Sequence, residues 1–177
     1  MKTVSSTLKR AVVPALVASL AVPALATPAA AQTPGSTALR LFGMVVLSAR
    51  SGVANHVTAS TTSGRVVLTD STGIALGPGC TRLSATSVDC GSVAGTSRLS
   101  VGLGDLADSF DGTSVSLPTL VDAGTGSDTV ATGSGNDTIG VSGDAPAVDT
   151  VTCDGGTADV VFADPGDSVA ADCESRH

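Results

Sequence analysis

The sequence predicts an all-β protein, in which a small β-rich N-terminal region precedes a C-terminal parallel β-roll, a solenoid of short stacked strands. Three observations predict this class. An Asp-x-apolar triplet recurs along the second half of the chain, as expected for strands that stack at a regular interval. Valine, threonine and serine dominate the first half, and no helical period of apolar residues follows the N-terminal leader. Only three residues are Phe, with no Trp or Tyr, so the core has to be aliphatic, which suits thin strands.

Residues 1–31 have the pattern of a secretory signal peptide. Three basic residues, Lys2, Lys9 and Arg10, precede an apolar stretch from Ala11 to Leu25. Two Ala-x-Ala sequences follow, and they predict cleavage after residue 26 or after residue 31. A membrane anchor would need about 20 unbroken apolar residues, whereas this stretch is shorter and contains prolines. We therefore expect a secreted, extracellular protein without a membrane span.

Residues 37–101 form the predicted β-rich N-terminal region. Runs of Val, Thr and Ser alternate there with turn residues such as Gly, Asp and Pro. The expected strands are 41–48, 56–61, 65–69, 82–88 and 98–101. Cys80 and Cys90 are close in sequence, so we expect a disulfide across a short hairpin, where facing Cα atoms lie about 4.5–5.5 Å apart. Export to an oxidising compartment favours such pairs.

Residues 102–177 carry the recurring triplet. Its six copies begin at Asp108, Asp128, Asp137, Asp149, Asp159 and Asp167. Two adjacent copies, 123–131 and 132–140, each read x-Gly-x-Gly-x-Asp-x-apolar-x and share a nine-residue period. The spacings between copies predict two stacks of turns, one with Asp108, Asp128, Asp149 and Asp167 and the other with Asp137 and Asp159. Cys153 and Cys173 are 20 residues apart, close to one coil, so we expect a disulfide between adjacent coils.

This repeat supplies oxygen ligands of the kind that calcium prefers. Glycines permit positive φ angles and leave backbone carbonyls exposed, and the aspartate adds a carboxylate. Calcium takes about 6–8 oxygens at about 2.3–2.6 Å. One turn cannot supply them, but two stacked turns can. The expected metal-site residues are Asp108, Gly124, Gly126, Asp128, Gly133, Gly135, Asn136, Asp137, Asp149, Asp159 and Asp167.

These residues resemble the RTX, or haemolysin-type, calcium-binding repeats over roughly residues 102–174. The resemblance is strong over 123–140 and degenerate elsewhere, because 144–151 lacks the glycines and Thr157 stands at a glycine position. The chain also resembles small secreted actinobacterial proteins with this repeat through 79–81, 88–90 and the ending 159–174. The resemblance implies a non-catalytic calcium-binding protein with Ca²⁺ as its cofactor.

The charge distribution agrees with a role for cations. From Leu99 onward the chain has fourteen acidic residues and one basic residue, Arg176. A compact fold with this density of carboxylates repels itself unless cations neutralise it, so we expect calcium to drive folding of the C-terminal half. The same charge makes nucleic acid and anionic membrane surfaces poor partners. Calcium ions are the expected partner, and export is compatible with an extracellular or cell-envelope partner.

Two other functions are compatible with the sequence. The first is a secreted hydrolase with its active site in residues 37–100, where a Ser-His-Asp arrangement would have to depend on His56 alone. That region is poor in His, Lys, Glu and aromatic residues. The second is a surface- or ligand-binding module in which Thr129, Thr138 and Thr150 form part of a flat array. We expect these threonines to lie on both sides of the roll.

Overall fold

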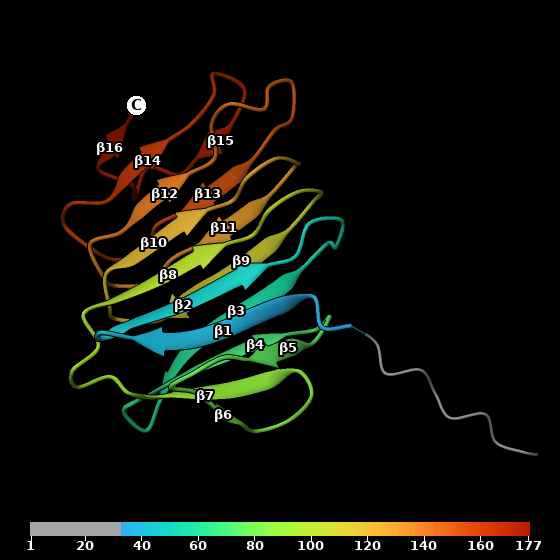
Figure 1. Cartoon of the computed structure of the whole chain (residues 1–177). Helices are drawn as coiled ribbons and strands as arrows, with labels where there is room; N and C mark the ends of the chain where they lie inside the picture. Colours follow the sequence, from blue (N-terminus) through green and yellow to red (C-terminus); the bar gives the residue numbers. More distant parts are fainter. Residues whose placement is uncertain (1–32) are drawn as a thin grey trace, which may run out of the picture. The chain divides into compact units, whose positions relative to one another are not determined.

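The computed structural model describes residues 33–177, which belong to one compact unit (Figure 1). The predicted signal peptide, residues 1–31, lies outside the described residues. Residues 33–177 contain sixteen β-strands and no helix, hence no helix that could cross a membrane. The all-β prediction is therefore confirmed. The strands are β1 (Ser36–Leu41), β2 (Met44–Ala49), β3 (His56–Thr62), β4 (Arg65–Asp70), β5 (Ile74–Leu76), β6 (Thr81–Arg82), β7 (Ser87–Ser92), β8 (Arg98–Gly102), β9 (Ser109–Ser114), β10 (Thr119–Asp122), β11 (Thr129–Ala131), β12 (Thr138–Gly140), β13 (Thr150–Thr152), β14 (Val160–Phe162), β15 (Ser168–Val169) and β16 (Ser175–Arg176).

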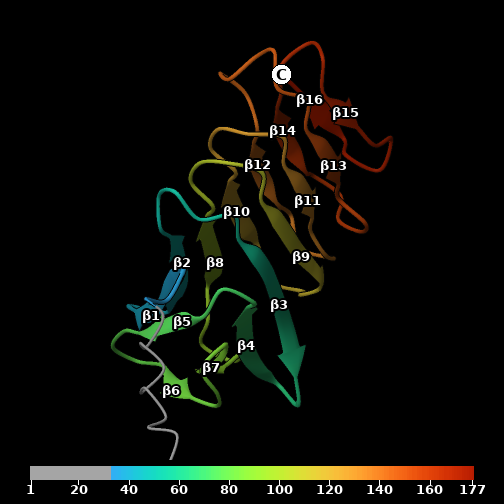
Figure 2. The ribbon, with the colours of Figure 1, turned by 90° about the vertical axis from the view of Figure 1, so that its right-hand side faces the viewer.

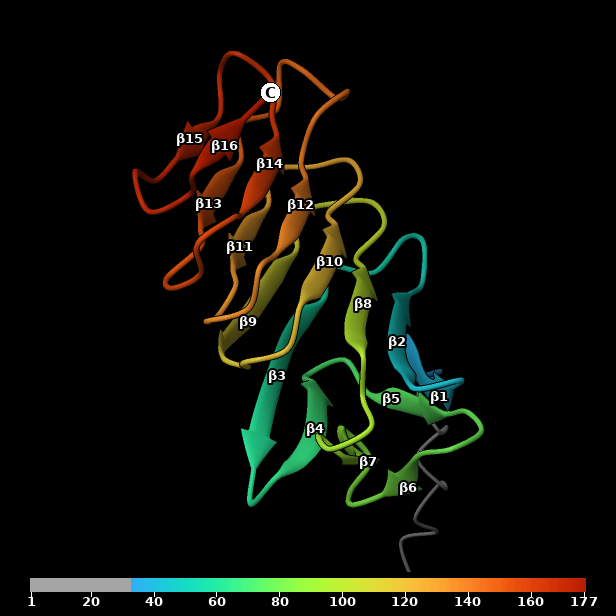
Figure 3. The ribbon, with the colours of Figure 1, turned by 90° about the vertical axis from the view of Figure 1, so that its left-hand side faces the viewer.

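The strands form two eight-stranded, mostly parallel sheets. Sheet A has the order β16-β14-β12-β10-β8-β2-β1-β5, and sheet B has the order β15-β13-β11-β9-β3-β4-β7-β6. From β8 onward the chain alternates between the sheets, so that each strand pairs in parallel with the strand two places later. Figures 2 and 3 show the two stacks of strands side by side. This alternation places every connecting turn at one of two ends of the strands.

The core lies between the two sheets and is built from the central apolar residue of each short strand. Successive residues of a strand point to opposite faces, so a three-residue strand buries only its middle side chain. The register aligns these residues in two columns. The sheet A column is Leu47, Val101, Val121, Ile139 and Val161, and the sheet B column is Val57, Phe110, Val130, Val151 and Val169. All except Val169 are at most 1% exposed.

The N-terminal region continues the same two sheets. Strand β2 pairs in parallel with β8, and β3 pairs in parallel with β9. Neither sheet is interrupted at the boundary between residues 101 and 102 that the sequence suggests. Residues 37–101 and 102–177 therefore share one core.

Two of the expected strands are wrong in their bounds. The expected strand 41–48 is divided by a turn at Phe42 and Gly43, whose φ angles are 50° and 78°. The expected strand 82–88 is divided because β6 ends at Arg82 and β7 begins at Ser87. Between them the Ser84 hydroxyl accepts a hydrogen bond from Thr86 N at 3.1 Å, and this local bond favours a turn over a strand.

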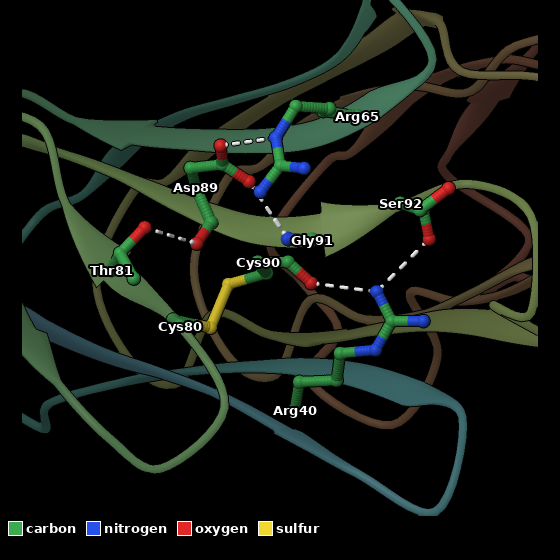
Figure 4. Close-up of a disulfide and its surroundings, with 8 residues drawn as sticks. All are labelled: Arg40, Arg65, Cys80, Thr81, Asp89, Cys90, Gly91 and Ser92. Atoms are coloured by element: carbon green, nitrogen blue, oxygen red, sulfur yellow. Dashed lines mark hydrogen bonds and ion pairs between the residues drawn. A yellow bond between two sulfur atoms is a disulfide. The ribbon is translucent and has the colours of Figure 1, made fainter.

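Both expected disulfides are present. Cys80, directly before β6, is bonded to Cys90 within β7, with their Cα atoms 4.1 Å apart, and Cys153 and Cys173 join two turns with Cα atoms 5.2 Å apart. Figure 4 shows the first bridge beside Arg40, whose Nη1 donates to the carbonyls of Cys90 at 2.8 Å and Ser92 at 2.9 Å. This guanidinium fixes β7 against β1.

Candidate metal-binding site

The turns at one end of the strands carry a continuous row of aspartates, which we call the first ladder: Asp108, Asp128, Asp149 and Asp167. Each Oδ1 accepts a hydrogen bond from a backbone N–H of the preceding turn. The donors are Asn55 to Asp108 (2.6 Å), Asp108 to Asp128 (2.8 Å), Asp128 to Asp149 (2.7 Å) and Asp149 to Asp167 (3.0 Å). The structure thus brings together the four aspartates that the sequence assigns to one stack.

The turns at the other end carry a second ladder, made of Asp137, Asp159 and Glu174. Thr119 N donates to Asp137 Oδ1, Asp137 N donates to Asp159 Oδ1, and Asp159 N donates to Glu174 Oε2, each at 2.7 Å. The separation of Asp137 and Asp159 from the first ladder agrees with the sequence. Glu174 was not expected in this row, because its longer side chain falls outside the repeated triplet.

Most ladder aspartates are buried and have one oxygen without a partner. The Oδ2 atoms of Asp108, Asp128, Asp137, Asp149 and Asp159 are inaccessible and accept no hydrogen bond within residues 33–177. Leaving a buried polar atom unsatisfied costs about 1–3 kcal/mol, and more for a charge. Each of these oxygens therefore requires a proton, a water molecule or a cation.

Burial also raises the affinity of these carboxyl groups for protons. The pKa of Asp128 rises to about 6, chiefly through burial and also through the charges of Asp149, Asp108 and Asp144. Burial likewise raises the pKa values of Asp108, Asp137, Asp149 and Asp159. Raised pKa values mean that the charged forms of these carboxyl groups are disfavoured unless a positive partner is present.

The repeat glycines allow backbone carbonyls of one turn to approach the next turn closely. A Cβ atom at Gly124 would lie 1.9 Å from Gly104 O, and one at Gly126 would lie 1.6 Å from Leu106 O. At the other end, a Cβ at Gly133 would lie 2.0 Å from Val115 O, and one at Gly135 would lie 2.4 Å from Leu117 O. Only glycine fits these positions, and the carbonyls that it admits are the second class of oxygen that calcium uses.

In the turn before β14, the glycine that allows close approach to the preceding turn is one residue earlier than the repeat predicts. Thr157 occupies the expected glycine position, but a Cβ at Gly156, one residue earlier, would lie 2.5 Å from Gly135 O. It would also lie 2.7 Å from Asp159 Oδ2. Gly156 therefore provides the close approach that Thr157 cannot.

Not every predicted ligand has a free oxygen. Both carboxylate oxygens of Asp167 accept backbone amides, from Asp149 at 3.0 Å and from Asp164 at 2.7 Å. The side-chain oxygen of Asn136 is exposed and accepts from Thr157 N at 3.1 Å. The oxygens of these two side chains therefore accept hydrogen bonds from backbone amides.

The sequence interpretation missed a further set of carboxylates and one amide. Asp105, Asp144 and Asp164 each accept backbone amides from the preceding turn, and three such amides, from residues 143–145, converge on Asp164. Backbone hydrogen bonds lower the pKa values of Asp105 and Asp164. A second aspartate three to five residues before Asp108, Asp149 and Asp167 was the available signal.

The missed amide is Asn55, which stands at the base of the first ladder. It is fully buried, and its Nδ2 donates to Asp70 Oδ2 at 2.7 Å and to Thr72 Oγ1 at 3.0 Å. Its backbone N–H donates to Asp108. The neutral amide thus ends the row of carboxylates next to the buried Asp70.

The donor set fits a hard divalent cation. Ladder carboxylates and turn carbonyls are oxygen ligands, which suit Ca²⁺. Within residues 33–177, the one trio of acidic, Cys or His side chains whose ligand atoms lie within 4.8 Å of one another is Cys153, Asp172 and Cys173. Its two sulfurs are joined in a disulfide, so they offer no thiolate to a soft metal. Within residues 33–177, no three carboxylates of a ladder bring ligand atoms within 4.8 Å of one another.

The structure also shows where the residues lie that a hydrolase or a surface-binding module would use. His56 Nδ1 lies 2.8 Å from Ser109 Oγ on the surface of sheet B, and among residues 33–177 no carboxylate hydrogen-bonds to this imidazole. Thr129 and Thr150 are register partners in sheet B, whereas Thr138 lies in sheet A. The threonines thus lie in both sheets, as expected.

No family model, curated protein or solved structure matches the chain.

Proposed function

We propose that this chain is a secreted, non-catalytic calcium-binding protein whose parallel strands form a β-roll of the RTX, or haemolysin-type, kind. The single observation that carries the proposal is the set of five buried ladder aspartates, each with one oxygen bound to a backbone amide and the other without a partner. A calcium ion between successive turns would bind the oxygens that lack a partner and would cross-link the turns.

The residues that would hold calcium follow from this geometry. On the first ladder they are Asp108, Asp128 and Asp149, together with the carbonyls that face Gly124 and Gly126. On the second ladder they are Asp137 and Asp159, with the carbonyls that face Gly133, Gly135 and Gly156. The bound ion would supply positive charge and additional coordination, and the chain supplies a fixed set of oxygens on two successive turns.

Several features support export and a calcium-linked fold. The basic and apolar leader supports secretion, and the two disulfides are compatible with an oxidising compartment. Each short strand buries one aliphatic side chain, which contributes about 1.5–3 kcal/mol, whereas fixing the backbone costs about 1–2 kcal/mol per residue. Neutralising the ladders therefore decides whether the turns stay stacked.

The proposal is tested by titrating the purified, metal-free protein with calcium. Calorimetry measures binding, and circular dichroism with hydrogen exchange measures folding. We expect protection of the amides in residues 123–140 to rise cooperatively with calcium and to fall when a chelator is added. Magnesium at the same concentration is the control, because it demands a small octahedral site. Equal protection in chelator and in calcium, with no heat of binding, would refute the proposed function.

A further inference from the structure

The turn between β12 and β13, residues 141–149, departs from the repeat and brings two carboxylates to the preceding turn. Asp149 Oδ1 accepts from Asp128 N at 2.7 Å, and Asp144 Oδ2 accepts from Gly126 N at 2.8 Å. Both side chains therefore lie against residues 126–128. We call the space between turns 123–128 and 141–149 the Asp144 gap.

Three buried carboxylate oxygens without partners belong to Asp128 of turn 123–128 and to the two side chains that contact this turn, Asp144 and Asp149. They are Oδ2 of Asp128, Oδ2 of Asp149 and Oδ1 of Asp144, none of which accepts a hydrogen bond within residues 33–177. Asp128 is 2% exposed and Asp149 is 0% exposed. The negative charge of Asp144 also acts on both ladder carboxyls and helps to raise their pKa values. The gap thus brings together three carboxylates with an unpartnered oxygen, whereas two adjacent ladder aspartates alone supply two.

Neighbouring gaps differ in this respect. At turn 163–167 both oxygens of Asp167 accept amides, and Asp164, the counterpart of Asp144, accepts three amides through Oδ2. On the second ladder the unpartnered carboxylates are Asp137 and Asp159 alone. Within the described residues, a third carboxylate with a buried, unpartnered oxygen beside a ladder pair occurs at the Asp144 gap.

We propose that the Asp144 gap is the tightest calcium site of the chain, with Asp128 and Asp149 as ligands and Asp144 as a third negative charge. The proposal rests on the proposed function. The three carboxylates do not all converge within 4.8 Å, so Asp144 acts through a coordinated water molecule, as one position of other calcium sites does. Calcium affinity rises with the number of ligand charges. The turn that has lost the repeat glycines therefore gains affinity from Asp144.

The test is calcium titration by calorimetry on the wild-type protein, Asp144→Asn and Asp164→Asn. Asp144→Asn keeps the size of the side chain and an acceptor for Gly126 N, but removes the charge at the gap. Asp164→Asn removes one charge from the corresponding position of the next turn, where neither Asp164 nor Asp167 has a buried oxygen without a partner. We expect the tightest binding step to weaken about tenfold in Asp144→Asn and by much less in Asp164→Asn, because the charge of Asp164 acts on Asp149 but not on Asp128.

The outcomes separate the two proposals. If the wild type binds calcium and Asp144→Asn keeps the tightest step, the Asp144 gap is not that site, whereas the proposed function stands. Equal weakening by both variants would show a general effect of net charge and would also overturn the inference. If the wild type binds no calcium, the proposed function itself fails.

A measurement on the wild type keeps the test independent of how the variants fold. In a calcium titration followed by amide NMR, the signals of Gly126 and Asp128 should change in the first step, because these amides donate to the carboxylates of the gap. The signals of Thr119 and Asp137, which donate on the second ladder, should change later. The reverse order would overturn the inference.

Discussion

Replacing Gly126 by alanine tests whether the close approach of successive turns holds the C-terminal half together. A methyl group there would lie 1.6 Å from Leu106 O and 2.3 Å from Leu106 C, and the φ angle of Gly126 is 141°. Real Cβ atoms essentially never approach another heavy atom closer than 3.0 Å. The two turns must therefore separate by more than 1 Å, because both groups in contact belong to the backbone.

The expected loss follows from the bonds that this separation breaks. Thr125 N donates to Gly104 O at 2.9 Å, and Asp108 N donates to Asp128 Oδ1 at 2.8 Å. Each bond contributes about 0.5–1.5 kcal/mol, and a side chain in this backbone conformation adds about 1–3 kcal/mol of strain. We expect the free energy of unfolding to fall by about 3–5 kcal/mol.

Urea denaturation in saturating calcium measures this change, with Gly102→Ala as the matched control. Gly102 lies at the end of β8, and no heavy atom lies within 4 Å of a Cβ placed there. The control should change the free energy of unfolding by less than about 0.5 kcal/mol. A loss below about 1 kcal/mol in Gly126→Ala would refute the idea that the turns are closely packed.

Three further predictions concern the ladders and their ends. The folded-state pKa of Asp128, about 6, lies above the ordinary 3.8, so its contribution to stability is present below about pH 4 and is lost as pH rises through about 6. The β-sheet signal of the metal-free protein in circular dichroism should therefore be stronger at pH 4.5 than at pH 7.5, and the opposite order would contradict the burial of an unpaired carboxyl group. Asn55→Asp places a carboxylate against the buried Asp70 and should cost about 3 kcal/mol or more. An unchanged urea midpoint would show that Asn55 does not end the ladder. Leu106 has a φ of 77° and is 49% exposed, so Leu106→Gly should relieve the left-handed strain and raise stability by about 0.5 kcal/mol in thermal melts. A decrease in stability would show that the packing of the Leu106 side chain contributes more than its backbone strain costs.

The sequence predicts the ladders well because their positions follow from period and chemistry. The nine-residue spacing of Asp128 and Asp137 implies alternate ends, and the structure places these residues on different ladders. Irregular spacings, such as the 22 residues from Asp137 to Asp159, correspond to longer turns and do not change the order of the rows. Local repetition was therefore sufficient to assign the aspartates to their stacks.

The base of the first ladder was not predictable in the same way. Asn55 and Asp108 are 53 residues apart, and strands β3–β8 lie between them in the chain. Asn55-His56-Val57 resembles the Asp-x-apolar triplet, but asparagine replaces the aspartate and no neighbouring copy supports it. Phe42 presented a similar difficulty, because its φ of 50° places a bulky residue where turns favour glycine or asparagine.

The two ends of each ladder differ chemically from its middle. The first ladder begins at the neutral Asn55 and finishes at Asp167, whose two oxygens both accept amides. The second begins at Thr119 and finishes at the exposed Glu174, beside the Cys153–Cys173 bridge. The unpartnered buried oxygens of the ladder aspartates lie between these ends. Protein groups satisfy both oxygens of Asp167 at the last turn of the first ladder, whereas the central turns, and Asn55 Oδ1 at its start, hold buried oxygens without a partner. A cation that binds there acts on the segment whose stacking the protein leaves electrostatically incomplete, and this links binding to the order of the central turns.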